Sequence, residues 1–380
     1  MNFSVAYILF AVDGGNSADD QNQTISCSLH LDPVDSVVEE QAGACTCYDQ
    51  TECGNECELG TDNCADEATC TDTADSFECS CNDGYTGDGV TCSEKFVVWL
   101  AYDRADWIAN GYVDNGHLDQ DGSWTDIRGS LNQVEVGEFG TFGINGNNRL
   151  YYKLGTHEDP YSAGPVTGTG NCGNDCRTEW QALGEDYQYV SSGRDTAIIL
   201  KGTPGTNMKL YSMENVSVDA SGDLQYELLE LDGGLKNVSV FRGIAWGVNG
   251  SNHIWRGDMA LARSAESRPY SWTRVDNEHT ITQIEIGEFG VFGLTDNGSI
   301  YYRIGTHQNI ESLGTSWQLI PGGLTHISSG INRVYGVNAN NQLFKMKSSN
   351  SFNAQGEMTW QDNNPWESIT SRTGSNVSVL

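Results

Sequence analysis

The stretch QVEVGEFGTFGINGNNRLYYKLGTH, from Gln133 to His157, recurs as QIEIGEFGVFGLTDNGSIYYRIGTH from Gln283 to His307. The two copies are identical at 14 of 25 positions and lie 150 residues apart. Each copy places β-branched and aromatic residues on both sides of an Asn/Gly turn, which is the pattern of a β-hairpin. Such a repeat predicts an array of equivalent structural units.

Looser copies of the hairpin pattern occupy the rest of residues 95–380. They begin at Lys95, Thr196, Phe241 and Ile331. Six hairpins over about 285 residues give a period of roughly 48, so the 150-residue repeat contains three units. One blade of a β-propeller, a four-stranded sheet, needs about 40 to 50 residues. Because such a sheet cannot bury both faces alone, the copies must stack, and a closed ring leaves no end exposed.

The sequence therefore predicts an all-β protein with a small disulfide-rich module at its front. We expect residues 94–380 to form a six-bladed β-propeller of four-stranded antiparallel blades that start near residues 96, 139, 194, 241, 289 and 331. The glycines of GEFGxFG are expected on the crowded innermost strands. A Trp follows most hairpins, and we interpret these residues as wedges between blades. The segments are SWTDI at Ser123, TEWQA at Thr178, SWTRV at Ser271, TSWQL at Thr315 and MTWQD at Met358.

The motifs V-x-x-G-E-F-G-x-F-G, YY-x-x-GT and ISSGINRVYGV resemble tectonin repeats, which form six-bladed propellers such as fish egg lectin and the horseshoe-crab tachylectins. The resemblance covers residues 95–380 and implies non-catalytic recognition of bacterial lipopolysaccharide, other glycans or proteins. This chain differs from those compact lectins by its cysteine-rich module, its negative charge and an insertion at Tyr161–Arg177. Cys172 and Cys176 are expected to form a disulfide within that insertion.

Ten of the twelve cysteines lie between Cys27 and Cys92, a density that in a secreted chain indicates a disulfide framework. The first four are expected to form two bridges of undetermined pairing in a collar over residues 27–56; they are Cys27, Cys45, Cys47 and Cys53. Zinc is disfavoured there because only His30 lies nearby and C-x-C without a second close pair is a poor zinc spacing.

The remaining six of these cysteines follow the spacing C-x6-C-x5-C-x8-C-x-C-x10-C. About 36 residues cannot bury a sufficient core, so cross-links must restrict the unfolded chain instead. The spacing and the closing segment CNDGYTGDGVTC resemble an EGF-like domain over residues 57–93. That resemblance implies the pairs Cys57–Cys70, Cys64–Cys79 and Cys81–Cys92.

The motifs NEC and C-x-D-x4-F-x-C resemble the calcium-binding subtype of this module. The resemblance implies Ca²⁺ as a cofactor, held by the side chains of Glu56 and Asp72 and by the carbonyls of Gly54, Thr73 and Ser76. The acidic residue expected four positions before the first cysteine is replaced by Cys53, so one ligand is absent. The alternative is an ordinary acidic EGF-like module that binds no calcium.

The chain carries 52 acidic and 20 basic residues, a net charge of −32. This charge disfavours nucleic acid as a partner because phosphate binding needs clustered Lys and Arg. No apolar run reaches the roughly 18 residues of a membrane span, so no membrane insertion is expected. No nucleophile elbow, P-loop, dinucleotide fingerprint or zincin helix is present, and the protein is predicted not to be an enzyme. His157 and His307 occupy one repeat position, which favours shared packing.

Both ends of the chain contain candidate strands. Residues 1–26 include an apolar run, Ala6–Val12, that fits either a leader or a strand arm. The segment Ser368–Leu380 is expected to form a further innermost strand, and one terminal strand is expected to close the ring while the other pairs with a second molecule. Sequons agree with a secretory route and offer glycosylation candidates at Asn22, Asn215, Asn237, Asn249, Asn297 and Asn376.

EGF-like and tectonin-like modules in one acidic chain are similar to subunits of protist flagellar hairs, the tubular mastigonemes. We therefore predict a secreted, non-enzymatic structural protein that contacts itself, related extracellular subunits or glycans in a fibre, coat or filament. The alternative is a soluble secreted lectin of the tectonin family that binds bacterial or cell-surface glycans.

Overall fold

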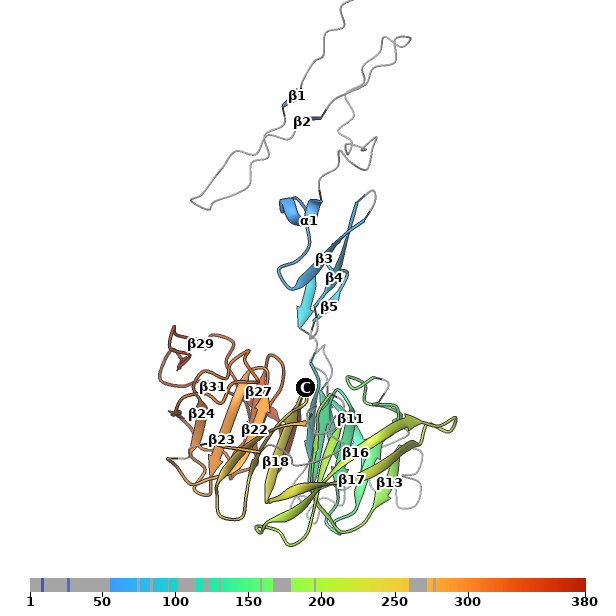
Figure 1. Cartoon of the computed structure of the whole chain (residues 1–380), viewed down its shortest axis with the longest axis vertical. Helices are drawn as coiled ribbons and strands as arrows, with labels where there is room; N and C mark the ends of the chain where they lie inside the picture. The colour runs from blue at the N-terminus through green and yellow to red at the C-terminus, as the bar shows by residue number, and fades with distance from the viewer. Residues whose placement is uncertain are drawn as a thin grey trace, which may run out of the picture. The chain divides into compact units, whose positions relative to one another are not determined.

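The structure is a computed structural model with two compact units, Met1–Ser93 and Glu94–Leu380 (Figure 1). It describes residues 8–9, 26–27, 55–73, 76–82, 85–94, 96–101, 114–118, 124–129, 131–157, 159–166, 179–194, 196–259, 272–275 and 278–380. Several expectations lie outside these residues: the leader or arm apart from residues 8–9 and 26, the collar disulfides, Gly54, the sequon at Asn22 and the Cys172–Cys176 bridge.

The first unit contains short elements joined by disulfides. Strands β1 (Ile8–Leu9) and β2 (Ser26–Cys27) pair with each other, and helix α1 (Glu56–Leu59) is followed by two small hairpins. The hairpins are β3 (Ala68–Asp72) with β4 (Phe77–Cys81), and β5 (Tyr85–Gly87) with β6 (Cys92–Glu94). The Asn55 side chain caps α1 by accepting from Glu58 N at 3.0 Å, and Gly60 ends it with a left-handed φ of 65°.

Covalent bonds replace a hydrophobic core in this unit. Among its described residues no hydrophobic side chain is fully buried. The structure joins Cys57 to Cys70, Cys64 to Cys79 and Cys81 to Cys92, the connectivity that the EGF-like resemblance implies. The chains pass so closely that a Cβ on Gly89, whose φ is 86°, would lie 2.2 Å from the Cys79 carbonyl oxygen.

Within the described residues, the second unit contains six four-stranded antiparallel sheets. Five use strands in chain order. They are β10 (Gln133–Gly137), β11 (Gly140–Ile144), β12 (Leu150–Lys153), β13 (Trp180–Gly184); β14 (Tyr187–Ser192), β15 (Ala197–Lys201), β16 (Met208–Val218), β17 (Leu224–Leu235); β18 (Asn237–Phe241), β19 (Ile244–Val248), β20 (Ile254–Asp258), β21 (Thr273–Val275); β22 (Ile281–Gly287), β23 (Gly290–Thr295), β24 (Ile300–Arg303), β25 (Trp317–Ile320); and β26 (His326–Ser329), β27 (Val334–Val337), β28 (Gln342–Met346), β31 (Trp366–Thr373). A small hairpin, β29 (Ser351–Phe352) with β30 (Met358–Thr359), precedes β31.

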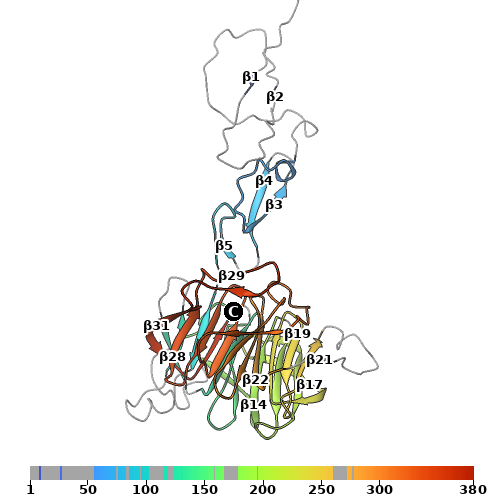
Figure 2. The same cartoon turned by 90° about the vertical axis from the view of Figure 1, so that its left-hand side faces the viewer.

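The sixth sheet joins the two ends of the second unit. The last strand, β32 (Asn376–Val379), pairs with β7 (Val98–Ala101), which continues to β8 (Asp114–Leu118) and β9 (Trp124–Arg128). The register runs from Asn376 opposite Ala101 to Val379 opposite Val98. The expectation that a terminal strand closes the ring is therefore met by the C-terminal strand, and the marked C-terminus lies among the strands in Figure 2.

The innermost strand of each sheet lines the centre of a ring. It is the first strand in chain order in five sheets and β32 in the sixth. These strands contact one another in the closed order β32, β10, β14, β18, β22, β26 and back to β32. The predicted fold class, an all-β propeller of four-stranded antiparallel blades behind a disulfide-rich module, is confirmed (Figures 1 and 2). The predicted blade starts fall beside the second strands, because each innermost strand precedes the hairpin turn that the sequence pattern marks.

Apolar side chains fill the spaces between neighbouring sheets. Trp180 of β13, which is 4% exposed, packs with Val134 of its own sheet, with Trp99 of the neighbouring sheet and with Val97 just before β7. Trp317 occupies the equivalent place three sheets later. In the segment MTWQD, Trp360 packs only at the edge of the core, and the buried tryptophan of that sheet is Trp366 instead.

The repeated spacing of glycines matches crowding at the centre. A Cβ on Gly137 would lie 2.1 Å from the carbonyl oxygen of Ser192, and one on Gly287 would lie 2.3 Å from that of Ser329. Real Cβ atoms do not approach so closely, so only glycine permits the innermost strands to come this near. The expected position is confirmed for the first glycine of each motif. The other glycines of GEFGxFG lie on the second strands instead, where Gly143 packs against Leu131 and Gly293 against Ile281.

We expect Asn376→Ala to weaken the closed ring. The Asn376 Oδ1 accepts from Val134 N at 2.9 Å, and its removal leaves a buried N–H without an acceptor. The free energy of unfolding, measured by urea denaturation, should fall by about 1–3 kcal/mol. The control is Asn147→Ala. The Asn147 side chain is exposed in a turn and joins no two blades, so this substitution should change the free energy of unfolding by less than about 0.5 kcal/mol. Equal effects of the two substitutions would contradict the assigned role of Asn376.

Candidate functional site

The centre of the propeller is lined by polar side chains at two levels. One level contains Gln133, Tyr189, Asn237, Gln283, His326 and Asn376, and the next, two residues later on each strand, contains Glu135, Ser191, Ser239, Glu285, Ser328 and Ser378. Because side chains two apart on a strand share a face, each level forms a ring around the axis. Both rings repeat after three strands, with Tyr189 and His326 as the one unmatched pair.

These side chains join neighbouring innermost strands by hydrogen bonds. Asn237 Oδ1 accepts from Ile284 N at 2.7 Å, and Ser239 Oγ accepts from Ile286 N at 3.0 Å. Three blades away, Asn376 and Ser378 accept in the same way from Val134 N and Val136 N. Backbone groups that face a neighbouring blade cannot join a β ladder, so these side chains supply the acceptors that burial requires.

This arrangement corrects two of the glycosylation candidates. Asn237 is 6% exposed and Asn376 is 5% exposed, and both side chains face the interior. Their Asn-Val-Ser triplets provide the Asn and Ser acceptors of the two rings. A glycan has no room at either position in the folded chain.

Two carboxyl groups lie in the second ring, on β10 and β22. Glu135 is 6% exposed and Glu285 is 3% exposed, and the Tyr189 hydroxyl donates to Glu285 Oε1 at 3.2 Å. Burial raises the pKa of Glu285 to about 7, against hydrogen bonds from Ser239, Gln283 and Tyr189. Burial, and then the charge of Glu285, raise the pKa of Glu135 well above its usual value. Burial also raises the pKa of Tyr189.

His326, the counterpart of Tyr189, lies in the first ring. Its Nε2 is 2.9 Å from the Val377 carbonyl oxygen and 2.9 Å from Asn376 Nδ2. Burial lowers the pKa of His326 to about 4, because the charged form loses its hydration. A neutral imidazole is therefore the stable form at neutral pH.

A pocket opens at one end of the channel, and a band of charged residues borders it. Arg242 lies 2.8 Å from Glu288 and 3.6 Å from Glu138, and Arg194 lies 3.0 Å from Glu138. The pocket encloses roughly 350 Å³, counting solvent at its mouth, and is lined by Glu135, Glu285 and Arg242 among others. Its charged groups thus lie next to partners of opposite charge at the mouth and next to hydroxyl groups at the floor.

The repeated histidines serve packing. The Nδ1 atoms of His157 and His307 lie 2.8 Å and 3.0 Å from the carbonyl oxygens of Phe139 and Phe289. Equivalent contacts in two blades match the expectation of a shared structural role. Sequence reasoning missed a buried ion pair beside the first of them, Lys153 with Glu179 at 3.6 Å, in which burial lowers the pKa of Lys153 to about 8.

The expected calcium ligands lie around the β3–β4 hairpin and α1. Glu56 is the first residue of α1, and Asp72 ends β3. The Ser76 carbonyl oxygen accepts from Thr73 N at 2.7 Å and from Thr73 Oγ1 at 2.6 Å. Both of its lone pairs are therefore engaged within the protein. Of the expected ligands, Glu56 and Asp72 are the two that offer carboxylates.

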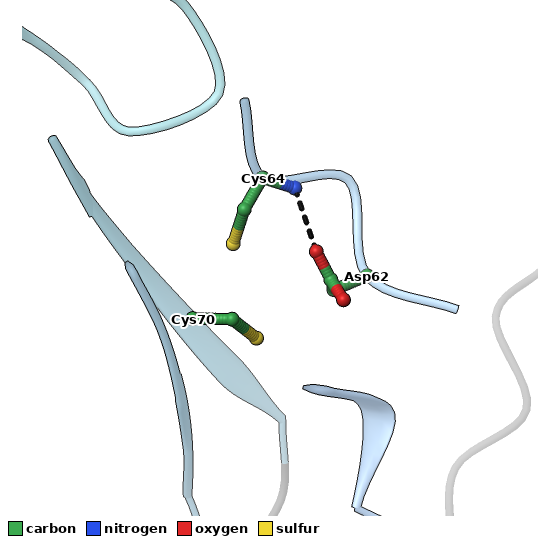
Figure 3. Close-up of side chains that lie close together, drawn as sticks. All are labelled: Asp62, Cys64 and Cys70. Carbon is green, nitrogen blue, oxygen red and sulfur yellow. Dashed lines mark hydrogen bonds between the residues drawn. The ribbon is translucent and has the colours of Figure 1, made fainter. Parts of the chain in front are cut away.

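A second group of metal-ligand types lies in the same unit. Asp62, Cys64 and Cys70 place their ligand atoms within 4.8 Å of one another, and Figure 3 shows Asp62 turned toward the Cys64 amide. Asp62 Oδ1 accepts from Cys64 N at 3.0 Å. Both sulfurs belong to disulfides, which removes the thiolates that a metal would need. The Asp62 carboxylate therefore stabilises the turn at Cys64, and the two sulfurs serve as cross-links.

The other described sequons lie at or near the surface. Asn215 and Asn297 are exposed, and Asn249 is half-buried. Among the residues that the structure describes, no helix is long and apolar enough to cross a membrane.

Two family models match the chain. The one described as "Tectonin domain" matches residues 166–378, and the one described as "EGF domain" matches residues 57–92. The chain is also 50% identical over 40 residues to "Signal peptide, CUB and EGF-like domain-containing protein 3" of Mus musculus and of Homo sapiens. Each of these matches covers 10% of this chain and 4% of the relative.

Solved structures with low identity are also similar. Yeast RCC1 (Prp20) bound to Kap60 is 11% identical with a TM-score of 0.38, over 80% of this chain and 82% of that chain. A chain of the Nidogen/Laminin complex is 9% identical with a TM-score of 0.38, over 75% and 98%. YCF48 from Cyanidioschyzon merolae is 13% identical with a TM-score of 0.35, over 70% and 80%.

We expect the two buried carboxyls to make stability fall as pH rises. A pKa raised in the folded state contributes stability that is fully present below the unfolded value, about 4.3, and is lost as pH rises through the folded value, about 7 for Glu285. In the double variant Glu135→Gln, Glu285→Gln this loss, about 3–4 kcal/mol for Glu285 alone, should be absent. Urea denaturation across pH 4 to 8 measures it.

Comparing the stability profiles of the parent and the double variant separates the effect of the two carboxyls from that of His326. The lowered pKa of His326 contributes stability above about 6.5 that is lost as pH falls toward about 4, and both proteins retain it. Glu311→Gln, at an exposed site in the same blade as Glu285, is the control and should keep the parent profile. A pH-independent difference between parent and double variant would contradict the assignment.

Proposed function

The chain belongs to the tectonin family, and from that premise we propose that it is a non-enzymatic extracellular protein that makes protein–protein contacts in a fibre, a coat or a flagellar-hair filament. The EGF module and the propeller provide the contact surfaces. Related extracellular subunits, or further copies of this chain, are the proposed partners, and glycans are a further class of ligand.

The observation that carries this proposal is the use of the propeller centre for closing the ring. The Asn and Ser side chains of the two rings accept hydrogen bonds from backbone N–H groups of neighbouring strands. The charged residues at the mouth form ion pairs with one another. A centre of this kind favours rigidity over turnover, because its Asn and Ser side chains hold neighbouring strands together and its carboxyl and imidazole groups are buried between those strands. Recognition is then left to the outer surfaces.

The EGF module supports the same role. Three disulfides stiffen a unit that lacks a buried hydrophobic side chain among its described residues, as is typical of small domains in oxidising compartments. A net charge of −32 opposes close association of identical chains unless cations reduce the repulsion. Divalent cations outside cells are therefore proposed to promote assembly.

We propose that Ca²⁺ binds weakly to the carboxylates of Glu56 and Asp72. Calcium prefers hard oxygen ligands and six to eight of them, and extracellular modules with incomplete sets bind it with Kd values of about 10⁻⁴ to 10⁻³ M. The engaged carbonyl of Ser76 and the cysteine at position 53 both reduce the set. Water molecules would supply the remaining ligands.

The full chain is expected to self-associate in millimolar calcium. Sedimentation velocity should show larger species when calcium is added, and a chelator should reverse them because the neutralising cations are removed. The same chain tested on a glycan array should show no strong binding. A monomer under all conditions that binds glycans would instead establish the secreted lectin, and the assembly proposal would be wrong.

Calcium binding is expected to depend on the two carboxylates. The Glu56→Gln, Asp72→Asn variant should lose the calcium signal in isothermal titration calorimetry, because each substitution removes an anionic ligand. Glu58→Gln, which removes one charge from the exposed face of the same helix, is the matched control and should retain it. Equal loss in both variants would mean that general charge, and not this ligand pair, attracts the ion.

A further inference from the structure

The described sequons differ in what their side chains do. Asn237 and Asn376 belong to the ring of acceptors at the channel and are buried. Asn249 is half-buried, and its Oδ1 accepts from Ser251 N at 3.0 Å and from His253 N at 2.9 Å. A neighbouring loop covers the turn that follows it, since Gly250 N donates to Asn207 Oδ1 at 2.7 Å.

Asn297 lies in the open turn between β23 and β24. Its side chain is exposed, and its Oδ1 accepts from Ser299 N at 3.2 Å and from the Ser299 hydroxyl at 2.9 Å. Ser299 is the hydroxyl residue of the Asn-Gly-Ser sequon. The oxygen of the amide is thus held inward, and the Nδ2 nitrogen makes no hydrogen bond to the described residues.

Asn215 lies in the long strand β16, where the pairing with β17 is bulged between Glu214 and Ser217. Its φ of 53° places it in the left-handed region, and it is exposed. Its Nδ2 donates one hydrogen to Glu227 Oε2 at 2.8 Å. The second hydrogen of the amide remains available.

We propose that Asn215 and Asn297 carry N-linked oligosaccharides, a modification that rests on the proposed extracellular location. In the reaction, the Asn Nδ2 attacks the anomeric carbon of a polyprenyl-diphosphate-linked oligosaccharide. A C–N bond forms, the C–O bond to the diphosphate breaks, the lipid diphosphate leaves, and the amide nitrogen loses one proton. The folded structure then accommodates the product at these two positions.

The glycan at Asn297 lies far from the channel mouth. Strand β23 runs from the turn that contains Glu288 to the turn that contains Asn297 and has six residues, which spans roughly 20 Å. The turns of the mouth therefore remain uncovered by this glycan. Modification would direct protein contacts away from the β23–β24 end of the blade.

The test uses the full chain expressed with a secretion signal in eukaryotic cells. Peptides of the secreted, disulfide-bonded fraction are treated with peptide N-glycosidase in heavy-oxygen water and analysed by mass spectrometry. We expect near-complete conversion at Asn215 and Asn297 and none at Asn237 or Asn376. Asn215→Gln and Asn297→Gln should each remove one glycan from the secreted protein, with unchanged yield.

Two results would overturn the proposal. One is a glycan at Asn237 or Asn376 in the secreted, folded fraction, since those side chains hold the ring. The other is unmodified Asn at both 215 and 297 in that fraction. Calcium-dependent self-association, measured before and after glycan removal, tests the assembly role separately, so failure of the modification leaves the proposed function standing or falling on its own result.

Discussion

Closing the ring with side-chain acceptors is the constraint on which the rest of the structure depends. The innermost strands approach one another without forming a ladder, so their inward amides need partners from the next blade. Asn, Ser and Gln provide them at fixed positions, as in the bonds from Ile284 N to Asn237 and from Val136 N to Ser378. The same positions therefore accept few other side chains, which ties the central residues to architecture.

The rings also show that the propeller is built from two similar halves. Each half contributes one Gln, one Asn, one Glu and two Ser to the channel, and Tyr189 in one half replaces His326 in the other. Both unmatched residues favour their uncharged form at neutral pH, because burial raises the pKa of Tyr189 and lowers that of His326. Glu285 is the exception, because burial raises its pKa to about 7, which is close to neutral pH.

Two different physical solutions hold the two units. The EGF unit buries too little apolar surface, and disulfides restrict its unfolded chain instead. The propeller has a large apolar core between blades, in which Trp180 and Trp317 lie at equivalent positions. The ring thereby provides a fixed surface, and the cross-linked module stays folded without a large apolar core.

The sequence alone determined the strand pattern, the repeat and the cysteine framework, because turn residues, β-branched runs and half-cystine spacing act locally. It also indicated that a terminal strand closes the ring. It could not show that two Asn-Val-Ser triplets face the channel, that Ser76 is engaged by Thr73, or that Glu135 and Glu285 influence each other across blades. Those facts depend on which strands become neighbours, and residues such as Val134 and Asn376, 242 positions apart, meet only when the ring is complete.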